Sequence, residues 1–269
     1  MNEKVQALIN EAVENMIAHT GSDKKIEGMI KKHDKKIHFI PKKYRVFGGM
    51  LQSMNIQFGN FIEELMSVII SKNDKYEIIE KYSGKKSNKF KISETNESLI
   101  DAYITKCQTE DIFLDAEFIL LMNKIIDNKD ENLKNFKHDI DLLFKEKSTG
   151  VYYYLEIKYN DDHDTGKFVD INRKFIKTSA YLINELNIKS LDQFKPILFF
   201  FNNKKMKGNI YIPESTNIYR GKRFFDEFLD IDYSDVEEYM ANLSESEATI
   251  DAFNQLYKKV MNYKNKPTN

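Results

Sequence analysis

The sequence predicts an α/β fold in which helices flank a central mixed β-sheet and the N-terminal half is helical. Three observations predict it. Apolar residues recur at helical spacing over residues 3–18 and again over 43–71. Two strand-like runs, 139–145 and 151–159, follow one another closely enough to form a β-hairpin. The apolar run PILFFF at 196–201 has the composition of a buried strand.

The N-terminal elements are predicted as follows. The first helix ends at Thr20-Gly21-Ser22, because glycine and small polar residues commonly terminate helices. The second apolar stretch is one long helix, or two in tandem if its glycines interrupt it. Residues 76–93 are predicted as short strands or irregular structure, and 97–106 and 111–126 as helices.

In the C-terminal half, Lys147-Ser148-Thr149-Gly150 is the turn of the hairpin. Residues 170–186 are predicted as a helix, 209–212 as a further strand, and the tail from Lys222 as helical. A loose boundary near residue 130 then separates a mainly helical part, 1–130, from a core with C-terminal helices, 131–269, although one single domain is also compatible with the pattern.

Composition restricts the class of protein. The 269 residues are 41% hydrophobic and 13% aromatic, which excludes a disordered chain. The single cysteine, Cys107, excludes a disulfide framework and a cysteine-based zinc site. No apolar run reaches the roughly 18 residues of a membrane span, and the charged N-terminus does not resemble a secretory signal. A cytoplasmic protein is expected.

Charge is distributed unevenly along the chain. The net charge is −1, yet residues 24–45 contain eight Lys and one Arg against two acids, a net of about +7. Residues 225–251 contain ten acids and no Lys or Arg. The basic stretch could bind phosphate through Lys42, Lys43 and Arg45, or it could be a solvated lysine-rich face.

The predicted hairpin carries the residues that suggest chemistry. Asp139 and Asp141 lie on its first strand, and Glu156 and Lys158 lie two residues apart on its second, so each pair shares a face. With a turn at Lys147–Gly150, Asp141 is expected opposite Glu156 and Asp139 opposite Lys158. A one-residue change of turn would exchange the two aspartates.

Two carboxylates that face each other across a hairpin repel unless a cation lies between them. Oxygen ligands with room for water favour Mg²⁺. A lysine on the same face can orient an attacking water or stabilise charge that develops on a phosphate. The sequence therefore suggests metal-dependent hydrolysis of a phosphate ester. The alternative, a surface salt bridge between Glu156 and Lys158, fits poorly with the apolar residues that flank both.

Glu156-Ile157-Lys158, preceded by an aspartate on the neighbouring strand, resembles the catalytic motif of the PD-(D/E)xK nucleases. No proline precedes either aspartate, which departs from the family pattern. The resemblance implies a restriction-endonuclease-like fold, Mg²⁺ bound by Asp141, Glu156 and the carbonyl of Ile157, and Lys158 beside the nucleophilic water. Asp139 is the alternative ligand; if it does not bind the metal, it could contact the residue that does.

Longer segments resemble a particular group. The runs EIKYNDDHDTGKFVDINRKFIKT, LQSMNIQFGNFIEEL and LIDAYITKCQ are similar to HinfI-like type II restriction endonucleases, and more loosely to the TdeIII-like group. IYRGKRFFDEFLDID resembles a segment found after the core in many type II enzymes. The resemblance implies a homodimer that cuts double-stranded DNA, with GANTC as the site to test first and a separate DNA methyltransferase to protect the host.

Further candidate residues flank the motif. Glu63, on the long helix, either lies near the metal or belongs to the polar side of an amphipathic helix. The loop after the second hairpin strand and the next helix offer side chains that could contact DNA: Tyr159, Asn160, Asp162, His163, Thr165, Lys167, Asn172, Arg173 and Lys174. The alternatives are a solvated loop, a second metal site that uses His163, and surface salt bridges.

The chain lacks the Gly-rich phosphate-binding motifs of ATP-driven enzymes and of methyltransferases. A translocating restriction enzyme is therefore excluded. Two other functions stay open. One is another PD-(D/E)xK nuclease, such as a repair or structure-specific enzyme. The other is a catalytically silent DNA-binding protein of this fold.

Overall fold

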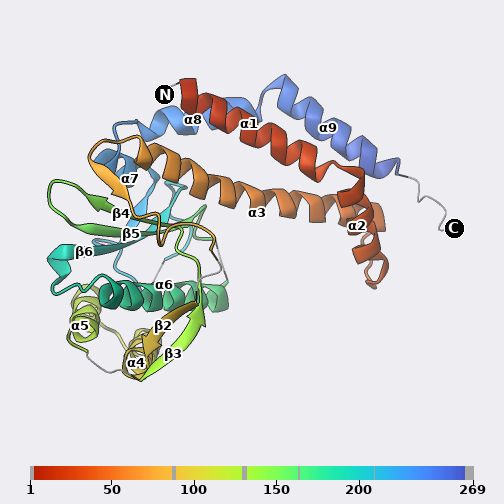
Figure 1. The fold of residues 1–269 in the computed structure, drawn as a ribbon. Helices are drawn as coiled ribbons and strands as arrows, with labels where there is room; N and C mark the ends of the chain where they lie inside the picture. Colours follow the sequence, from red (N-terminus) through yellow and green to blue (C-terminus); the bar gives the residue numbers. More distant parts are fainter. Residues whose placement is uncertain (1–2, 87–88, 129–131, 163, 209, 264–269) are drawn as a thin grey trace. The chain divides into compact units, whose positions relative to one another are not determined.

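The computed structural model describes residues 3–86, 89–128, 132–162, 164–208 and 210–263 (Figure 1). The chain divides into two compact units, Met1–Leu65 with Ile231–Asn269, and Met66–Asp230. The boundary predicted near residue 130 lies inside the second unit.

The first unit is helical, as expected for the N-terminal half. Its helices are α1 (Glu3–Thr20), α2 (Asp23–Asp34), most of α3 (Lys42–Ser71), α8 (Tyr233–Ser244) and α9 (Glu247–Met261). They share a core formed by Ile26, Val46, Met50, Met54, Leu256 and Val260.

The stretch predicted as one helix or two is the single helix α3, which runs through all three of its glycines without a break. Gly49 lies where α2 approaches, because a Cβ there would be 3.1 Å from His33 Nε2. The helix α2 within the basic stretch was not predicted from the sequence.

The second unit contains a five-stranded sheet in the order β1-β4-β5-β6-β7. The strands are β1 (Tyr76–Ile78), β4 (Leu142–Glu146), β5 (Tyr152–Lys158), β6 (Phe194–Phe200) and β7 (Ile218–Arg220). The first three are antiparallel neighbours, whereas β5, β6 and β7 are parallel, so the sheet is mixed, as predicted.

Helices cover this sheet on both faces. On one face, α6 (Thr165–Glu185) packs with α4 (Glu94–Thr109), α5 (Leu114–Asp127) and the two-stranded ribbon β2 (Lys89–Ser93)–β3 (Leu133–Lys137) (Figure 1). On the other face, Phe228 of α7 (Gly221–Phe228) contacts the rings of Phe144 and Tyr153. The short 3₁₀ helix Leu191–Gln193 leads into β6. These layers confirm the α/β fold predicted from the sequence.

Two strand predictions need correction. The expected strand at 209–212 is wrong, because residues 210–212 form bends in which Tyr211 and Ile212 are buried, and the last strand is β7. Apolar character marked burial there, but the backbone does not pair. The first hairpin strand begins at Leu142 and not at Asp139. In the described part of the chain, none of the helices has both the length and the hydropathy that a membrane crossing requires.

Candidate active site

The β4–β5 hairpin has the predicted turn and register. Gly150 adopts φ +77°, a left-handed backbone conformation that residues other than glycine rarely adopt. Leu142 pairs with Leu155, and the same register continued by one residue places Asp141 opposite Glu156. The backbone N–H of Ile157 donates to Asp141 Oδ2 at 2.7 Å, which fixes that carboxylate against β5.

The ammonium of Lys158 lies where three oxygen atoms converge. Its Nζ is 2.8 Å from Glu156 Oε1, 2.8 Å from the carbonyl oxygen of Ile157 and 3.4 Å from Asp141 Oδ2. These are the three oxygens that the family resemblance assigned to a metal ion. A positive charge therefore already neutralises the two carboxylates, which would otherwise repel each other.

Glu156 is the most enclosed group of the site, with a side chain only 4% exposed. Its Oε2 accepts a hydrogen bond from the Tyr154 hydroxyl at 2.7 Å and lies 3.2 Å from His138 Nε2. Burial raises the pKa of Glu156, but the nearby Lys158 and His138 outweigh this and lower the pKa to about 2. The carboxylate is thus ionised at neutral pH and held on both oxygens.

Two residues that hold Glu156, Tyr154 and His138, were not predicted from the sequence. Tyr154 lies two residues before Glu156 on the same strand, so the alternation of a strand places both side chains on one face. The sequence offered this signal, but the tyrosine was interpreted only as part of an apolar flank. His138 contacts the site from the segment between β3 and β4, and no local pattern in the sequence indicates that contact.

The site fits a divalent metal ion. Its donors are all hard oxygens, two carboxylates and one backbone carbonyl, and a cation already lies among them. No cluster of three or more His, Cys, Asp or Glu ligands occurs among the described residues. An ion bound to so few protein ligands would retain several waters, as Mg²⁺ usually does.

Asp139 has a different position from Asp141. Its Oδ1 accepts a hydrogen bond from the backbone N–H of Lys86 at 3.1 Å, on the segment that leads into β2. The side chain of Asp141 is within reach of Lys158, whereas Asp139 connects two backbone segments. This arrangement favours Asp141 as the ligand and Asp139 as a structural residue.

The loop after β5 is partly structural. Asp161 is 2% exposed, and it accepts from Met206 N at 2.9 Å and from Arg220 Nη2 at 3.0 Å. Its neighbours face solvent: Tyr159 is 45% exposed, and Asp162 pairs with Lys207 at the surface. Asn160 accepts from the backbone of Asp162 in a local turn. His163 lies outside the described residues.

Helix α6 begins at Thr165, directly after this loop, and Asp164 caps it by accepting from Lys167 N. Lys167 and Lys174 are exposed and Arg173 is half-buried; Arg173 pairs with Asp101, and Lys174 pairs with Asp170. Asn172 is fully buried and donates to Phe168 O at 2.7 Å, which disfavours the predicted contact with a base.

The other predicted residues belong to α3 in the first unit. Glu63 is half-buried there. Lys42 pairs with Asp34, Lys43 donates to the carbonyl of Met261, and Arg45 donates to the carbonyls of His33 and Lys36 near the end of α2. Arg45 therefore stabilises its own unit, and contacts of these residues with DNA stay a prediction.

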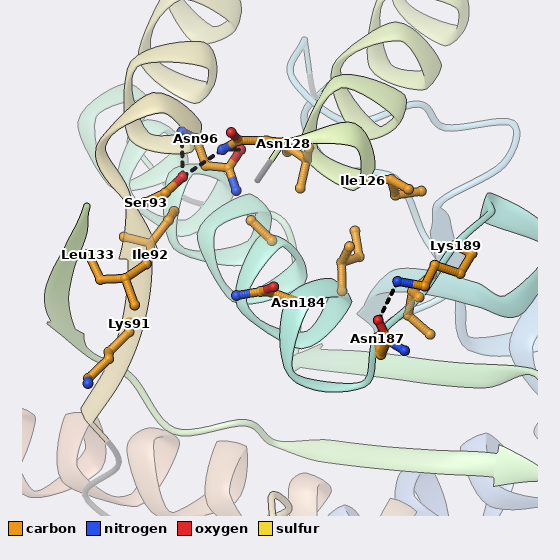
Figure 2. A pocket seen from close by; sticks show the side chains of 14 residues that line it. Lys91, Ile92, Ser93, Asn96, Ile126, Asn128, Leu133, Asn184, Asn187 and Lys189 are labelled. Atoms are coloured by element: carbon orange, nitrogen blue, oxygen red, sulfur yellow. Dashed lines mark hydrogen bonds between the residues drawn. The ribbon is translucent and has the colours of Figure 1, made fainter. Parts of the chain in front are cut away.

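A pocket of about 540 Å³ lies elsewhere in the second unit, beside β2 and the C-terminal end of α6 (Figure 2). Since α6 has 21 residues, this end lies about 30 Å from the end that follows β5. The amide of Asn128 donates to Ser93 Oγ and to Asn96 Oδ1, at the start of α4. These polar groups bond to one another, and none of the candidate active-site residues described above lines the pocket.

Comparison with known proteins agrees with the geometry. A family model described as "Type II restriction endonuclease, HinfI" matches residues 1–244. The type II restriction enzyme HinfI of Haemophilus influenzae is 60% identical to this chain over 262 residues, which cover 97% of this chain and 99% of that enzyme. No solved structure matches the chain.

Proposed function

Because this chain belongs to the HinfI family of type II restriction endonucleases, we propose that it cuts double-stranded DNA at GANTC with Mg²⁺ bound at the β4–β5 hairpin. It is a site-specific deoxyribonuclease, and enzymes of this type generally use a divalent metal ion. The observation that carries the proposal is the convergence of three oxygen atoms on the ammonium of Lys158.

Each residue of the site has a distinct task in this proposal. Asp141, Glu156 and the Ile157 carbonyl would hold Mg²⁺, which when bound supplies charge neutralisation at the phosphate and at the leaving 3′ oxygen. Lys158 orients the water that attacks phosphorus in line, while the bond from phosphorus to the 3′ oxygen breaks. Tyr154 and His138 keep Glu156 in place.

Lys158 has a more exposed side chain than the two carboxylates that it contacts. Its side chain is 24% exposed, whereas those of Glu156 and Asp141 are 4% and 12% exposed. An ammonium and a divalent ion compete for the same oxygens, so Lys158 would turn towards the more exposed side of the site in the loaded enzyme. There it would meet the water and the scissile phosphate.

The loop and helix that follow the catalytic strand are the proposed DNA contacts near the cut. The proposed contacts are the exposed residues Tyr159, Asp162, Lys167 and Lys174 and the half-buried residues Asn160 and Arg173. Thr165 lies at the start of the same helix, and His163 between them is also proposed. Lys42, Lys43 and Arg45 would meet the DNA backbone, and Glu63 is a proposed supporting acid.

A homodimer is proposed because a palindromic site presents the same sequence to two symmetry-related subunits. Uncontrolled cutting would destroy the genome of the host, so a separate DNA methyltransferase that modifies the same site is the proposed functional partner. The proposed location is the cytoplasm, where the enzyme would meet incoming DNA.

Sequencing the ends of digestion products tests the function. A plasmid of known sequence, incubated with the protein and Mg²⁺, should give discrete fragments that all end at GANTC, and none in EDTA. Discrete ends at another sequence would refute the proposed recognition site. A smear would point to a non-specific or structure-specific nuclease, and binding without cuts to a silent DNA-binding protein.

A further inference from the structure

The ribbon β2–β3 carries an unusual pair of lysines. In its register, Lys89 lies directly opposite Lys137, and Lys91 lies opposite Asn135. Like charges that face each other across a β-ladder destabilise it. The Lys89–Lys137 pair therefore lowers the stability of the ribbon unless an anion lies beside the two ammonium groups.

The two faces of the ribbon differ. Phe90 packs against Phe136 with ring centroids 5.6 Å apart, on the face turned to the core. Lys134, on the same strand as Phe136, pairs with Glu94 and Glu97 of α4. These contacts of the inward face attach the ribbon to the rest of the unit.

The outward face consists of exposed polar side chains. Its residues Lys89, Lys91, Asn135 and Lys137 are all exposed. In the parts of the chain that the structure describes, the three lysines have no ion-pair partner, although lysines elsewhere in this unit commonly have one. An exposed surface with three unpaired positive charges and an amide remains.

The end of this surface that carries Lys89 and Lys137 lies near the candidate active site in the sequence. Lys137 is followed directly by His138, which contacts Glu156, and Asp141 is the fourth residue after Lys137. Four residues span at most roughly 14 Å. On the other strand, Lys86, three residues before Lys89 in the sequence, donates its backbone N–H to Asp139. Both lysines are thus close in sequence to residues that contact the segment 138–141.

We propose that the outward face of β2–β3 binds the duplex beside the cut, with Lys89 and Lys137 on the DNA backbone and Lys91 and Asn135 at base edges. A two-stranded ribbon fits the major groove, which is about 12 Å wide. Since one strand advances about 3.4 Å per nucleotide, a backbone span of at most roughly 14 Å places the backbone of Lys137 within about four nucleotide steps of Asp141. The inference rests on the proposed function, because contacts near the cut can read the sequence only if the recognition site on the DNA is short.

Lys91 and Asn135 have the chemistry to read bases. Lysine can donate to the O6 and N7 acceptors of guanine, and asparagine can bond adenine in a bidentate manner. They lie one outward-facing pair further from the catalytic segment than Lys89 and Lys137. The ribbon would therefore hold the backbone near the cut and read the sequence beyond it.

The salt dependence of binding tests the backbone contacts. Binding to a short duplex is measured by fluorescence anisotropy in EDTA, so that the DNA stays intact. For Lys89→Gln and Lys137→Gln, the slope of log K against log salt should become shallower by about 0.9 each, and by about 1.8 in the double variant. Lys134→Gln is the matched control on the inward face and should leave the slope unchanged.

Unfolding of the free proteins separates a binding defect from a folding defect. Lys89→Gln and Lys137→Gln relieve a like-charge contact, so their melting temperatures should equal or exceed that of the wild type. Asn135→Ala should reduce the preference for the cognate duplex over random DNA by roughly 5- to 150-fold, with no change in salt slope.

An unchanged salt slope in the double variant overturns the inference, whichever sequence the wild type cuts. An unchanged slope in a protein that cuts at GANTC overturns the inference alone. A shallower slope in a protein that does not cut supports the DNA-binding surface and refutes the proposed function. An equal change in salt slope for Lys134→Gln and for the outward lysines would also refute the proposed DNA-binding surface, because the net charge of the protein would then explain the effect.

Discussion

Replacing Glu156 by Gln should destabilise the second unit in the absence of metal ions. The carboxylate is 4% exposed and has donors on both oxygens, Lys158 on Oε1 and Tyr154 with His138 on Oε2. A glutamine amide can place an oxygen on only one of these sides, so its NH₂ group faces a donor on the other.

The size of the effect follows from burial. Removing one partner of a buried ion pair typically costs about 3–5 kcal/mol. Because Lys158 is 24% exposed and keeps its contacts with Asp141 and the Ile157 carbonyl, the lower end is expected, about 3 kcal/mol. For a unit of this size, that corresponds to a fall in melting temperature of about 6–12 °C.

Differential scanning calorimetry in EDTA measures the shift. Glu146→Gln is a matched control on the same hairpin, because its carboxylate accepts a hydrogen bond from the exposed Thr149 hydroxyl, at 2.7 Å. The control should stay within about 0.5 kcal/mol of the wild type. A Glu156→Gln variant as stable as the wild type, or more so, would refute the reasoning, since repulsion between Asp141 and Glu156 would then dominate.

Three further predictions concern the same unit. Asp141→Asn should reduce the cleavage rate far more than Asp139→Asn. Asp141 is the proposed metal ligand, whereas an asparagine at position 139 could still accept the hydrogen bond from Lys86 N through its side-chain oxygen. Equal losses of cleavage rate would contradict the choice of Asp141 as the ligand. Tyr154→Phe should raise the metal concentration needed for half-maximal cleavage about 10- to 100-fold, and an unchanged metal titration would show that the hydroxyl does not position Glu156. Burial raises the pKa values of Tyr76 and Tyr153 to about 12, whereas an unfolded tyrosine titrates near 10. The unfolded chain therefore loses protons first, and the urea midpoint should be steady below about pH 10 and fall from there towards pH 12; a midpoint that stays constant through this range would contradict it.

The β4–β5 hairpin was predictable because its determinants are local. A four-residue turn that ends in glycine fixes the register, and the register places Asp141 opposite Glu156. Strand alternation then brings Lys158 to the same face. The position of its ammonium among the three oxygens depends on side-chain torsions, which sequence spacing does not specify.

Elements defined by distant partners were harder to predict. The three residues of β1 become a strand only by pairing with β4, and β2 pairs with β3 across two helices. The segment at 210–212 has the apolar composition of a strand, but its side chains are buried without backbone pairing. Composition therefore indicated burial correctly and strand pairing incorrectly.

Burial also decided which predicted site residues can reach a ligand. Asn172 and Asp161 lie among polar residues typical of a DNA-contacting loop, yet both are enclosed and bonded within the protein. Arg220 is engaged by Asp161 and Glu214. A sequence shows which side chains could bind DNA, but the packing of α6 and β7 determines which of them are accessible.

The most direct test of the central claim is the cleavage rate of a GANTC duplex by Lys158→Ala, measured with enzyme in excess at saturating Mg²⁺. Lys145→Ala is the control, a lysine of the same hairpin whose ammonium lies over the ring of Tyr152. If Lys158 acts on the water and the phosphate, the rate should fall by about 10²–10⁴-fold while the control keeps the wild-type rate. Cleavage by Lys158→Ala at the wild-type rate would contradict the assignment of the active site to this hairpin.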